Sequence, residues 1–364
     1  MELKLGDQLR ALPGPILITG HTGFKGTWLI FLLEYLGIPC VGYSLAPEKD
    51  SLYDRAKLEG RIPEIYADIR DFSSYKKFLN THRPSTVIHM AAQPLVLQSY
   101  NAPRDTFDVN VMGTVNVLDA AFASDYVQAI IGVTTDKVYR NDNLGRAFVE
   151  SDPLAGKDPY SASKVGAEAA IASWQQIQKI SGGPIVVSVR AGNVIGGGDW
   201  AQNRLIPDLV RAFISGQVAE IRNPKSTRPW QHVLDPLFGY LLTLEHALED
   251  NSVTAINFAP TEKSFTVAEV AQIARESWGD SAKINHSGYE FTEQLESSQL
   301  HLDSSLSQQL FGFSGSWNQT ESIRKSIDWW KRVLLIGMAP SDCVKEDITE
   351  FLNTKFQKID KFNQ

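Results

Sequence analysis

The chain has 364 residues, 43% of them hydrophobic, which allows a large buried core and predicts a globular protein with two unequal lobes. Its net charge of -7 argues against nucleic acid as the main partner, and its two cysteines, Cys40 and Cys343, have neither disulfide-framework nor metal-ligand spacing. The longest apolar stretch, residues 28–43, is too short and too interrupted to span a bilayer, and the N-terminus has no signal-peptide pattern. We therefore expect a cytoplasmic protein with no membrane partner.

Strand and helix patterns alternate along the first half of the chain. Short apolar runs predict strands, and the longer segments between them predict helices. In chain order, the expected strands are 16–18, 40–43, 65–67, 86–89, 129–133 and 185–189. The expected helices are 26–35, 72–79, 104–122 and 160–178. This alternation predicts an α/β fold built on a doubly wound, Rossmann-type parallel sheet.

The alternation stops after Gly192, where glycines and prolines separate short segments. We interpret this part as a smaller α/β lobe that closes over the carboxyl edge of the sheet. Residues 257–260 are expected to return to the first lobe, and the chain after Pro340 is expected to be weakly patterned and frayed. The predicted division is a dinucleotide-binding domain over 1–190 with a return near 230–260, a substrate lobe over 191–345 and a tail over 346–364.

A glycine-rich segment follows the first predicted strand and opens the first helix. Gly20, Gly23 and Gly26 have the spacing GxxGxxG. In a dinucleotide site the first glycine allows a sharp turn, the second admits a pyrophosphate to the backbone, and the third lets the helix pack on the sheet. A tight turn without a ligand is the alternative, but the strand before and the helix after favour a dinucleotide site.

Two further groups of residues suggest acid–base chemistry. Tyr160 and Lys164 are four residues apart on a predicted helix, so that they share a face, and a nearby cation favours the phenolate of a tyrosine. Thr135, Asp136 and Lys137 follow a predicted strand at the edge where doubly wound sheets bind ligands. A surface Tyr–Lys pair and a strand-ending turn with a solvated lysine are the alternatives.

Together these motifs are similar to those of the extended short-chain dehydrogenase/reductase family, and within it to the nucleotide-sugar 4,6-dehydratases. Lysine at position 137 is typical of the CDP-glucose branch, whereas glutamate is usual in the dTDP-glucose branch. The blocks that carry the resemblance, spread over residues 16–330, are 20–26, 90–96, 110–114, 135–137, 160–164, 190–200 and 228–233.

The resemblance implies conversion of CDP-glucose to CDP-4-keto-6-deoxyglucose with a bound NAD that is reduced and reoxidised in one turnover. Tyr160 is implied as the base at the sugar 4-hydroxyl, with Thr135 bonded to the same oxygen. Lys137 is assigned as the base at C5 and Asp136 as the acid at the 6-hydroxyl. The site must then lower the pKa of Lys137 by burial and nearby cations, and keep Asp136 protonated.

The resemblance also implies binding residues. The implied NAD contacts are Gly20, Thr22, Gly23, Phe24, Gly26, Asp68, Ile69, Ala91, Ala92, Gln93, Asn110, Tyr160 and Lys164. The implied nucleotide-sugar contacts are Asn193, Arg204, Arg228 and His232, although a packed core histidine is an open alternative for His232. Ser44 follows the second strand where an acidic residue commonly selects NAD, so NAD is chosen by resemblance. A helix cap is the alternative for Asp68, and no metal site is expected.

Two other functions remain open. A 4-epimerase or decarboxylase of the same superfamily would share the glycine loop and the Tyr–Lys pair, but would not need an acid and a base after Thr135. A non-catalytic dinucleotide sensor usually lacks the tyrosine or the lysine. The helices at 104–122 and 160–178 are apolar on more than one side, which predicts a homodimer built on them, unless burial inside one chain explains the pattern. The resemblance also implies deoxysugar biosynthesis for lipopolysaccharide O-antigen.

Overall fold

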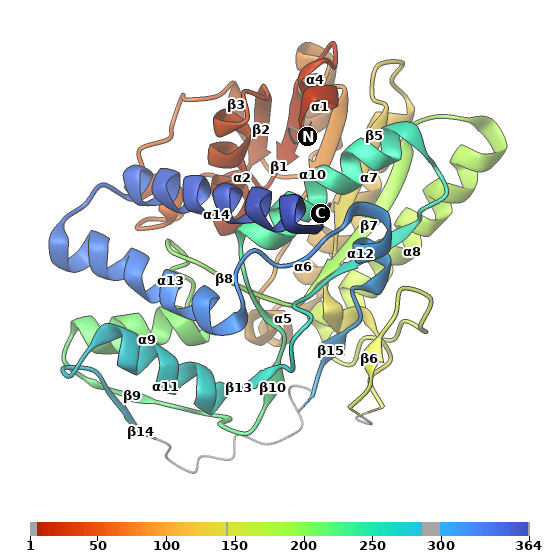
Figure 1. Ribbon diagram of the computed structural model, residues 1–364. Helices are drawn as coiled ribbons and strands as arrows, with labels where there is room; N and C mark the ends of the chain where they lie inside the picture. Colours follow the sequence, from red (N-terminus) through yellow and green to blue (C-terminus); the bar gives the residue numbers. More distant parts are fainter. Residues whose placement is uncertain (1–5, 143–144, 286–298, 363–364) are drawn as a thin grey trace.

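The computed structural model describes residues 6–142, 145–285 and 299–362 (Figure 1). Its centre is a seven-stranded parallel sheet in the order β12-β7-β5-β4-β1-β2-β3. The strands are β1 (Ile16–Thr19), β2 (Cys40–Ser44), β3 (Glu64–Tyr66), β4 (Thr86–His89), β5 (Ala129–Val133), β7 (Ile185–Ala191) and β12 (Ala255–Phe258). The order runs outward from β1 in both directions, so the predicted doubly wound α/β sheet is confirmed, with its switch point between β1 and β4.

Helices cover both faces of this sheet. Successive residues of β1 face opposite sides, so Ile16 and Ile18 belong to one core cluster and Leu17 to another. The first cluster also draws on α2 (Phe24–Tyr35) and α10 (Leu234–Glu249). The second draws on α4 (Phe72–His82), α7 (Gly113–Phe122) and α8 (Pro159–Ser181). Burial on both faces explains why the central strands read as continuous apolar runs.

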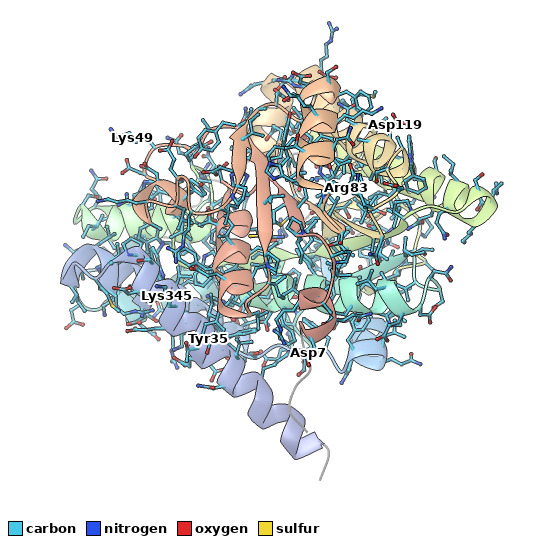
Figure 2. The ribbon with its side chains drawn as sticks, turned by 90° about the horizontal axis from the view of Figure 1, so that it is seen from above. Asp7, Tyr35, Lys49, Arg83, Asp119 and Lys345 are labelled. Atoms are coloured by element: carbon cyan, nitrogen blue, oxygen red, sulfur yellow. The ribbon has the colours of Figure 1, made fainter. Side chains whose placement is uncertain are left out.

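Residues 340–362 form a helix, where a frayed segment was expected. Helix α14 (Pro340–Phe362) lies across α2, and Val344, Ile348 and Phe351 are fully buried (Figures 1 and 2). Its apolar residues recur every three or four positions, and charged residues fill the remaining face. Sandwiched between the sheet and α14, α2 is buried over residues 26–33.

The smaller elements gather beyond the carboxyl ends of the strands. Helices α9 (Leu205–Ile214), α11 (Val267–Trp278) and α13 (Gln319–Lys331) pack on one another. Short strand pairs join this part: β6 (Ala147–Phe148) with β15 (His301–Leu302), β8 (Asn193–Ile195) with β11 (Trp230–His232), β9 (Val218–Glu220) with β14 (Lys283–Asn285), and β10 (Thr227–Arg228) with β13 (Phe265–Thr266). The remaining helical segments are α1 (Asp7–Arg10), α3 (Leu52–Arg55), α5 (Val96–Asn101), α6 (Pro103–Phe107), η1 (Asp108–Met112), η2 (Asp136–Val138), α12 (Ser305–Phe311) and η3 (Arg332–Ile336). The predicted domain boundaries at 190 and 345 stay predictions.

The segment predicted as one helix over 104–122 is interrupted. Helix α6 passes into the π-helical turn η1 before α7 begins. The wider turn contains Asn110, which is buried, and π turns of this kind often accompany functional sites. Within the described ranges, no helix is long and apolar enough to cross a membrane.

Candidate active site

The glycine loop forms a cradle at the N-terminus of α2. Gly20 has φ 77°, a conformation that favours glycine. A Cβ on Gly26 would lie 2.3 Å from the carbonyl oxygen of Gly20, whereas a Cβ on Gly23 would meet only that oxygen, at 3.3 Å. Gly20 and Gly26 therefore close the turn, and Gly23, which precedes α2, leaves an open approach to the helix N-terminus. This cradle fits the diphosphate of a dinucleotide.

Polar side chains surround the carboxyl end of β2, next to the glycine loop. The Thr22 hydroxyl lies 2.8 Å from that of Ser44, where an acidic residue is common. Asp68 forms a 2.6 Å ion pair with Arg70, which also contacts Asp105, and this hydrogen-bonded arginine lowers the pKa of Asp68. The helix-cap alternative for Asp68 is wrong, because Asp71 is the residue whose side chain caps α4.

The loop after β4 is tied to α8 through two buried amides. The Gln93 backbone N–H donates to Asn110 Oδ1 at 2.8 Å, and Asn110 Nδ2 donates to Ser163 Oγ at 2.8 Å. Ala91 lies directly against Gly20, since a Cβ on that glycine would stand 2.8 Å from the Ala91 nitrogen. The loop after β4 therefore borders the cradle at Ala91.

Helix α8 carries the tyrosine and the lysine on one buried face. Asp158 and Ser161 form a capping box at its start, and Pro159 is its first residue. Tyr160 and Lys164 are 9% and 6% exposed. Lys164 Nζ donates to the carbonyl oxygen of Val133 at 3.1 Å. Burial lowers the pKa of Lys164 to about 8, against the attraction of Glu168.

The electrostatics of Tyr160 differ from the sequence-based expectation. Burial raises the pKa of Tyr160 to about 12, a hydrogen bond with Thr135 lowers it, and the charge of Asp136 raises it. The positive charge of Arg204 lowers the pKa of this phenol. The Lys164 ammonium donates to the Val133 carbonyl, and its expected effect on the Tyr160 phenol stays a prediction.

The segment after β5 brings the carboxyl group of Asp136 close to Tyr160. Thr135 Oγ1 accepts from the Lys137 N–H at 3.3 Å and donates to Asp136 Oδ1 at 3.0 Å. Asp136 is 2% exposed, and among the described residues its second carboxylate oxygen has no hydrogen-bond partner. Burial raises the pKa of Asp136, although Lys137, Thr135 and Arg228 oppose the shift. The net effect is a carboxyl group that binds its proton more tightly than an aspartate in water.

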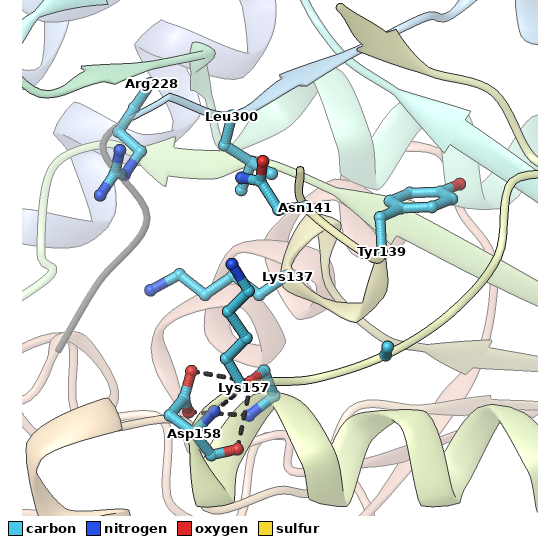
Figure 3. A pocket seen from close by; sticks show the side chains of 9 residues that line it. Lys137, Tyr139, Asn141, Lys157, Asp158, Arg228 and Leu300 are labelled. Atoms are coloured by element: carbon cyan, nitrogen blue, oxygen red, sulfur yellow. Dashed lines mark hydrogen bonds between the residues drawn. The ribbon is translucent and has the colours of Figure 1, made fainter. Parts of the chain in front are cut away.

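Cations line the pocket beside this acid. Lys137, Lys157 and Arg228 face a common space together with Asn141, while the ring of Tyr139 points away from it (Figure 3). Arg228 is buried in β10, and its guanidinium also donates to the Thr227 carbonyl.

The other residues predicted to bind the substrate are Arg204, Asn193 and His232, and they lie in two different environments. Arg204 precedes α9 and pairs with Asp199 at 3.0 Å, close enough to Tyr160 to influence its pKa, and Asn193 begins β8. His232 is fully buried, with its ring edge-on to Trp28 at 5.5 Å and Trp317 at 4.7 Å. Burial lowers the pKa of His232 to about 3. The burial and the neutral ring favour the core-histidine alternative, and the substrate role of His232 stays a prediction.

A buried carboxylate that the sequence argument missed anchors α8. Glu168 pairs with Arg190 at 2.8 Å and also accepts from the hydroxyls of Ser188 and Thr134. Both charged side chains are at most 6% exposed. The sequence spacing could have revealed Glu168, since it follows Lys164 by four residues and so lies one turn along the same helix face.

A second missed group lies on the cradle helix. Lys25 Nζ donates to the Tyr240 hydroxyl of α10 at 3.1 Å. Burial lowers the pKa of Lys25 to about 7, with further lowering by Arg204 and Lys164. The sequence shows that Lys25 lies inside the glycine motif, but it does not show that the side chain extends toward Tyr240.

A doubly wound parallel sheet, a glycine cradle and a buried Tyr–Lys pair define an extended short-chain dehydrogenase/reductase. The chain belongs to the family described as GDP-mannose 4,6 dehydratase, whose profile matches residues 17–334. It is 37% identical to CDP-glucose 4,6-dehydratase of Salmonella typhimurium over 347 residues, covering 93% of this chain and 96% of the relative. It is 28% identical to dTDP-glucose 4,6-dehydratase of Xanthomonas campestris over 232 residues, covering 60% and 64%.

Solved structures share the fold. UDP-glucose 4-epimerase of Thermus thermophilus, in complex with NAD, superposes with a TM-score of 0.75 at 22% identity, covering 87% of this chain and 99% of that one. For dTDP-glucose 4,6-dehydratase of Bacillus anthracis, also in complex with NAD, the TM-score is 0.73 at 18% identity, covering 88% and 98%. Both epimerases and dehydratases therefore use this architecture, and the choice between them depends on the site.

Proposed function

We propose that this chain is an NAD-dependent 4,6-dehydratase that converts CDP-D-glucose to CDP-4-keto-6-deoxy-D-glucose. The identity of 37% with a CDP-glucose 4,6-dehydratase over nearly the whole chain supports the reaction. The observation that carries the proposal is the buried cluster of Thr135, Asp136 and Tyr160, in which a carboxyl with raised pKa stands beside a phenol. An epimerase needs the phenol but has no use for the acid.

In this proposal the cradle of Gly20, Gly23 and Gly26 holds NAD, with Lys164 beside the nicotinamide end. The hydride chemistry would be supplied by NAD held there, as the acceptor of hydride from C4 of the sugar and its donor to C6. Tyr160 removes the proton of the 4-hydroxyl, and Thr135 bonds the same oxygen. Because burial holds the phenol protonated, the phenolate must be stabilised by nearby positive charge, to which Arg204 contributes.

Elimination of water uses the segment after Thr135. Once C4 is a ketone, the C5 proton is acidic, and Lys137 removes it. The carbon–oxygen bond at C6 breaks, and protonated Asp136 gives its proton to the departing hydroxyl, so that water leaves. When hydride is returned to C6, the Lys137 ammonium gives its proton back to C5, which completes the 4-keto-6-deoxy sugar. The orphaned oxygen of Asp136 supports this role, because a buried carboxyl group without a full set of partners is a group that a ligand can complete.

Arginines are suited to the diphosphate of the nucleotide sugar. A guanidinium binds phosphate through parallel hydrogen bonds and stays charged when buried. We assign Arg204 and Arg228 to this task and Asn193 to the sugar or nucleotide. The pocket that Arg228 shares with Lys137 supports this assignment, since substrate held there lies beside the proposed base (Figure 3).

The direct test is incubation of the purified protein with CDP-glucose and NAD. A 4,6-dehydratase yields a 4-keto-6-deoxy sugar, which develops ultraviolet absorbance in alkali. A 4-epimerase yields CDP-galactose, and a dinucleotide sensor leaves the sugar unchanged. UDP-glucose and dTDP-glucose, tested in parallel, decide whether cytosine is the preferred base.

We also propose a cytoplasmic homodimer that uses the helices beside the active site. Apolar side chains on their outer faces are exposed: Leu97, Tyr100, Phe107, Met112, Ile177 and Ile180. These residues lie on α5, α6, η1 and α8, and pairing of these segments with a second copy would remove such a surface from water. Sedimentation analysis tests this, and a monomer at micromolar concentration would contradict it.

A further inference from the structure

The loop between β8 and α9 ends at Arg204, one of the arginines assigned to the diphosphate. It contains three consecutive glycines, and two of them lie where a side chain would not fit. A Cβ on Gly197 would collide with the ring of Trp329, and one on Gly198, which has φ 81°, would stand 2.7 Å from Leu52. The loop is therefore pressed between α13 and α3, the short helix that follows β2.

The tryptophan of this loop lies between two guanidinium groups. The centroid of the Trp200 ring is 5.3 Å from the guanidinium carbon of Arg55, on α3, and 5.0 Å from that of Arg211, on α9. Arg55 also lies 5.7 Å from the ring of Trp330, whose centroid is 4.6 Å from that of Trp200. Cation–π contacts of this kind are attractive, and more so when they are partly removed from water. Arg55, Trp200 and Arg211 form the Trp200 clamp, which joins elements far apart in the sequence.

The Trp200 clamp also fixes the backbone that leads to Arg204. The Arg211 guanidinium donates to the carbonyl oxygens of Trp200 and Ala201, at 2.9 Å and 3.1 Å. Asp199, which is 4% exposed, accepts from the Ala201 N–H at 3.3 Å and pairs with Arg204 at 3.0 Å. Because Asp199 and Ala201 flank the clamped tryptophan, the clamp holds the carboxylate that orients the Arg204 guanidinium.

The segment after β2 reaches the same arginine by charge. Arg55 donates to the Asp50 carbonyl oxygen at 2.8 Å and pairs with its half-exposed carboxylate at 3.3 Å. An exposed ion pair stabilises little, so the aromatic rings are the contact that distinguishes Arg55. The charge of Asp199 raises the pKa of Arg204, and Glu48, from the same segment as Arg55, acts in the same direction.

We propose that Arg55 and Trp200 are positioning residues for Arg204, which they hold in the orientation that binds the diphosphate of a nucleotide sugar. The inference rests on the proposed assignment of Arg204 to that diphosphate. A guanidinium binds phosphate through parallel N–H groups, so its plane must be oriented as well as its charge. A loop that already holds the side chain in place reduces the rotamer freedom lost when the ligand binds.

The experiment measures the affinity of the NAD-loaded protein for CDP by titration calorimetry, because CDP has the diphosphate but no hexose to be converted. Arg55→Met removes a guanidinium from the clamp, so CDP should bind about three- to tenfold more weakly. Trp200→Leu should lose at least as much, whereas Trp200→Phe, which keeps an aromatic face, should stay within about threefold of the wild type. Arg61→Met is the matched control, since Arg61 lies 5.3 Å from the ring of Phe31 on α2, outside the clamp, and should bind CDP as the wild type does.

A double variant separates positioning from a general structural effect. Arg204→Met removes the group that the clamp orients and should itself weaken CDP binding. Adding Arg55→Met to Arg204→Met should then cost no further affinity, because the two residues act through one contact with the ligand. A residue that merely stabilises the fold would produce the same loss in both backgrounds.

Two results would overturn the inference. One is wild-type CDP affinity in Arg55→Met, and the other is an equal fold loss from Arg55→Met with and without Arg204. If Trp200→Leu does not fold, the Arg55 and Arg204 variants still decide. Wild-type CDP affinity in Arg204→Met, or absence of CDP binding in every protein, would remove the assignment of Arg204 together with the inference. The expected pattern of CDP affinities without turnover of CDP-glucose would contradict only the proposed reaction.

Discussion

The two ends of the proposed cofactor crevice are built differently. At the proposed catalytic end, Tyr160, Lys164 and Asp136 are all under 10% exposed, and burial shifts the pKa of each. At the other end, the Asp68–Arg70 pair has side chains 32% and 36% exposed. Removal from water strengthens electrostatic effects and perturbs protonation, while exposed charges are screened. The comparison teaches that the proposed acid–base residues lie where the ionisable groups are shielded from water.

Substitution of the phenol should produce the largest effect. Tyr160→Phe removes the group that takes the 4-hydroxyl proton, so kcat with CDP-glucose should fall by about 10³- to 10⁴-fold. NAD binding should be retained, since the ring remains and Lys164 is unchanged. Alkaline absorbance of the product and calorimetric titration of NAD measure the two quantities. Turnover within about tenfold of the wild type would remove Tyr160 from the mechanism.

Substitution within the buried Glu168–Arg190 ion pair should cause a large loss of stability. Glu168→Gln leaves the charge of Arg190 buried without its carboxylate, and the free energy of unfolding should fall by about 3–5 kcal/mol. Urea denaturation measures this loss. The double variant Glu168→Gln, Arg190→Met removes the stranded charge and should recover part of it. A loss below about 1 kcal/mol in the single variant would contradict the anchoring role.

Substitutions of two lysines that line one pocket should have different effects on the reaction. Lys137→Ala removes the proposed C5 base, so keto-sugar formation should slow by about 10²- to 10³-fold while oxidation at C4 continues. Reduced nicotinamide should then accumulate, visible in its near-ultraviolet absorbance. Lys157→Ala, on the same pocket wall, should change KM by only a few fold and accumulate none (Figure 3). Normal elimination in Lys137→Ala would reassign the base.

Much of this architecture was predictable because it depends on local patterns. The alternating strands and helices gave the sheet, and the glycine spacing gave the cradle, since both follow from backbone geometry. The apolar spacing of α14 was also present, but its charged face obscured it, so a frayed end was predicted where Val344 and Phe351 are buried. Contacts with α2, far away in sequence, stabilise this helix.

The site was predictable only where one element carries it. Tyr160 and Lys164 share a helix face, so their spacing revealed them. Lys25 and Tyr240 are 215 residues apart and meet through the packing of α2 and α10, which no spacing shows. The surroundings of His232 were hidden for the same reason, because the two tryptophan rings beside it come from distant segments.

The smallest effect is expected at the exposed end of the crevice. Arg70→Ala breaks ion pairs with Asp68 and Asp105, but water and salt already screen these charges, so the free energy of unfolding should fall by less than about 1 kcal/mol. That loss should shrink further in high salt, whereas the loss in Glu168→Gln should not. Urea denaturation at low and high salt measures both. A salt-independent loss of several kcal/mol in Arg70→Ala would mean that both ends of the crevice are equally preorganised.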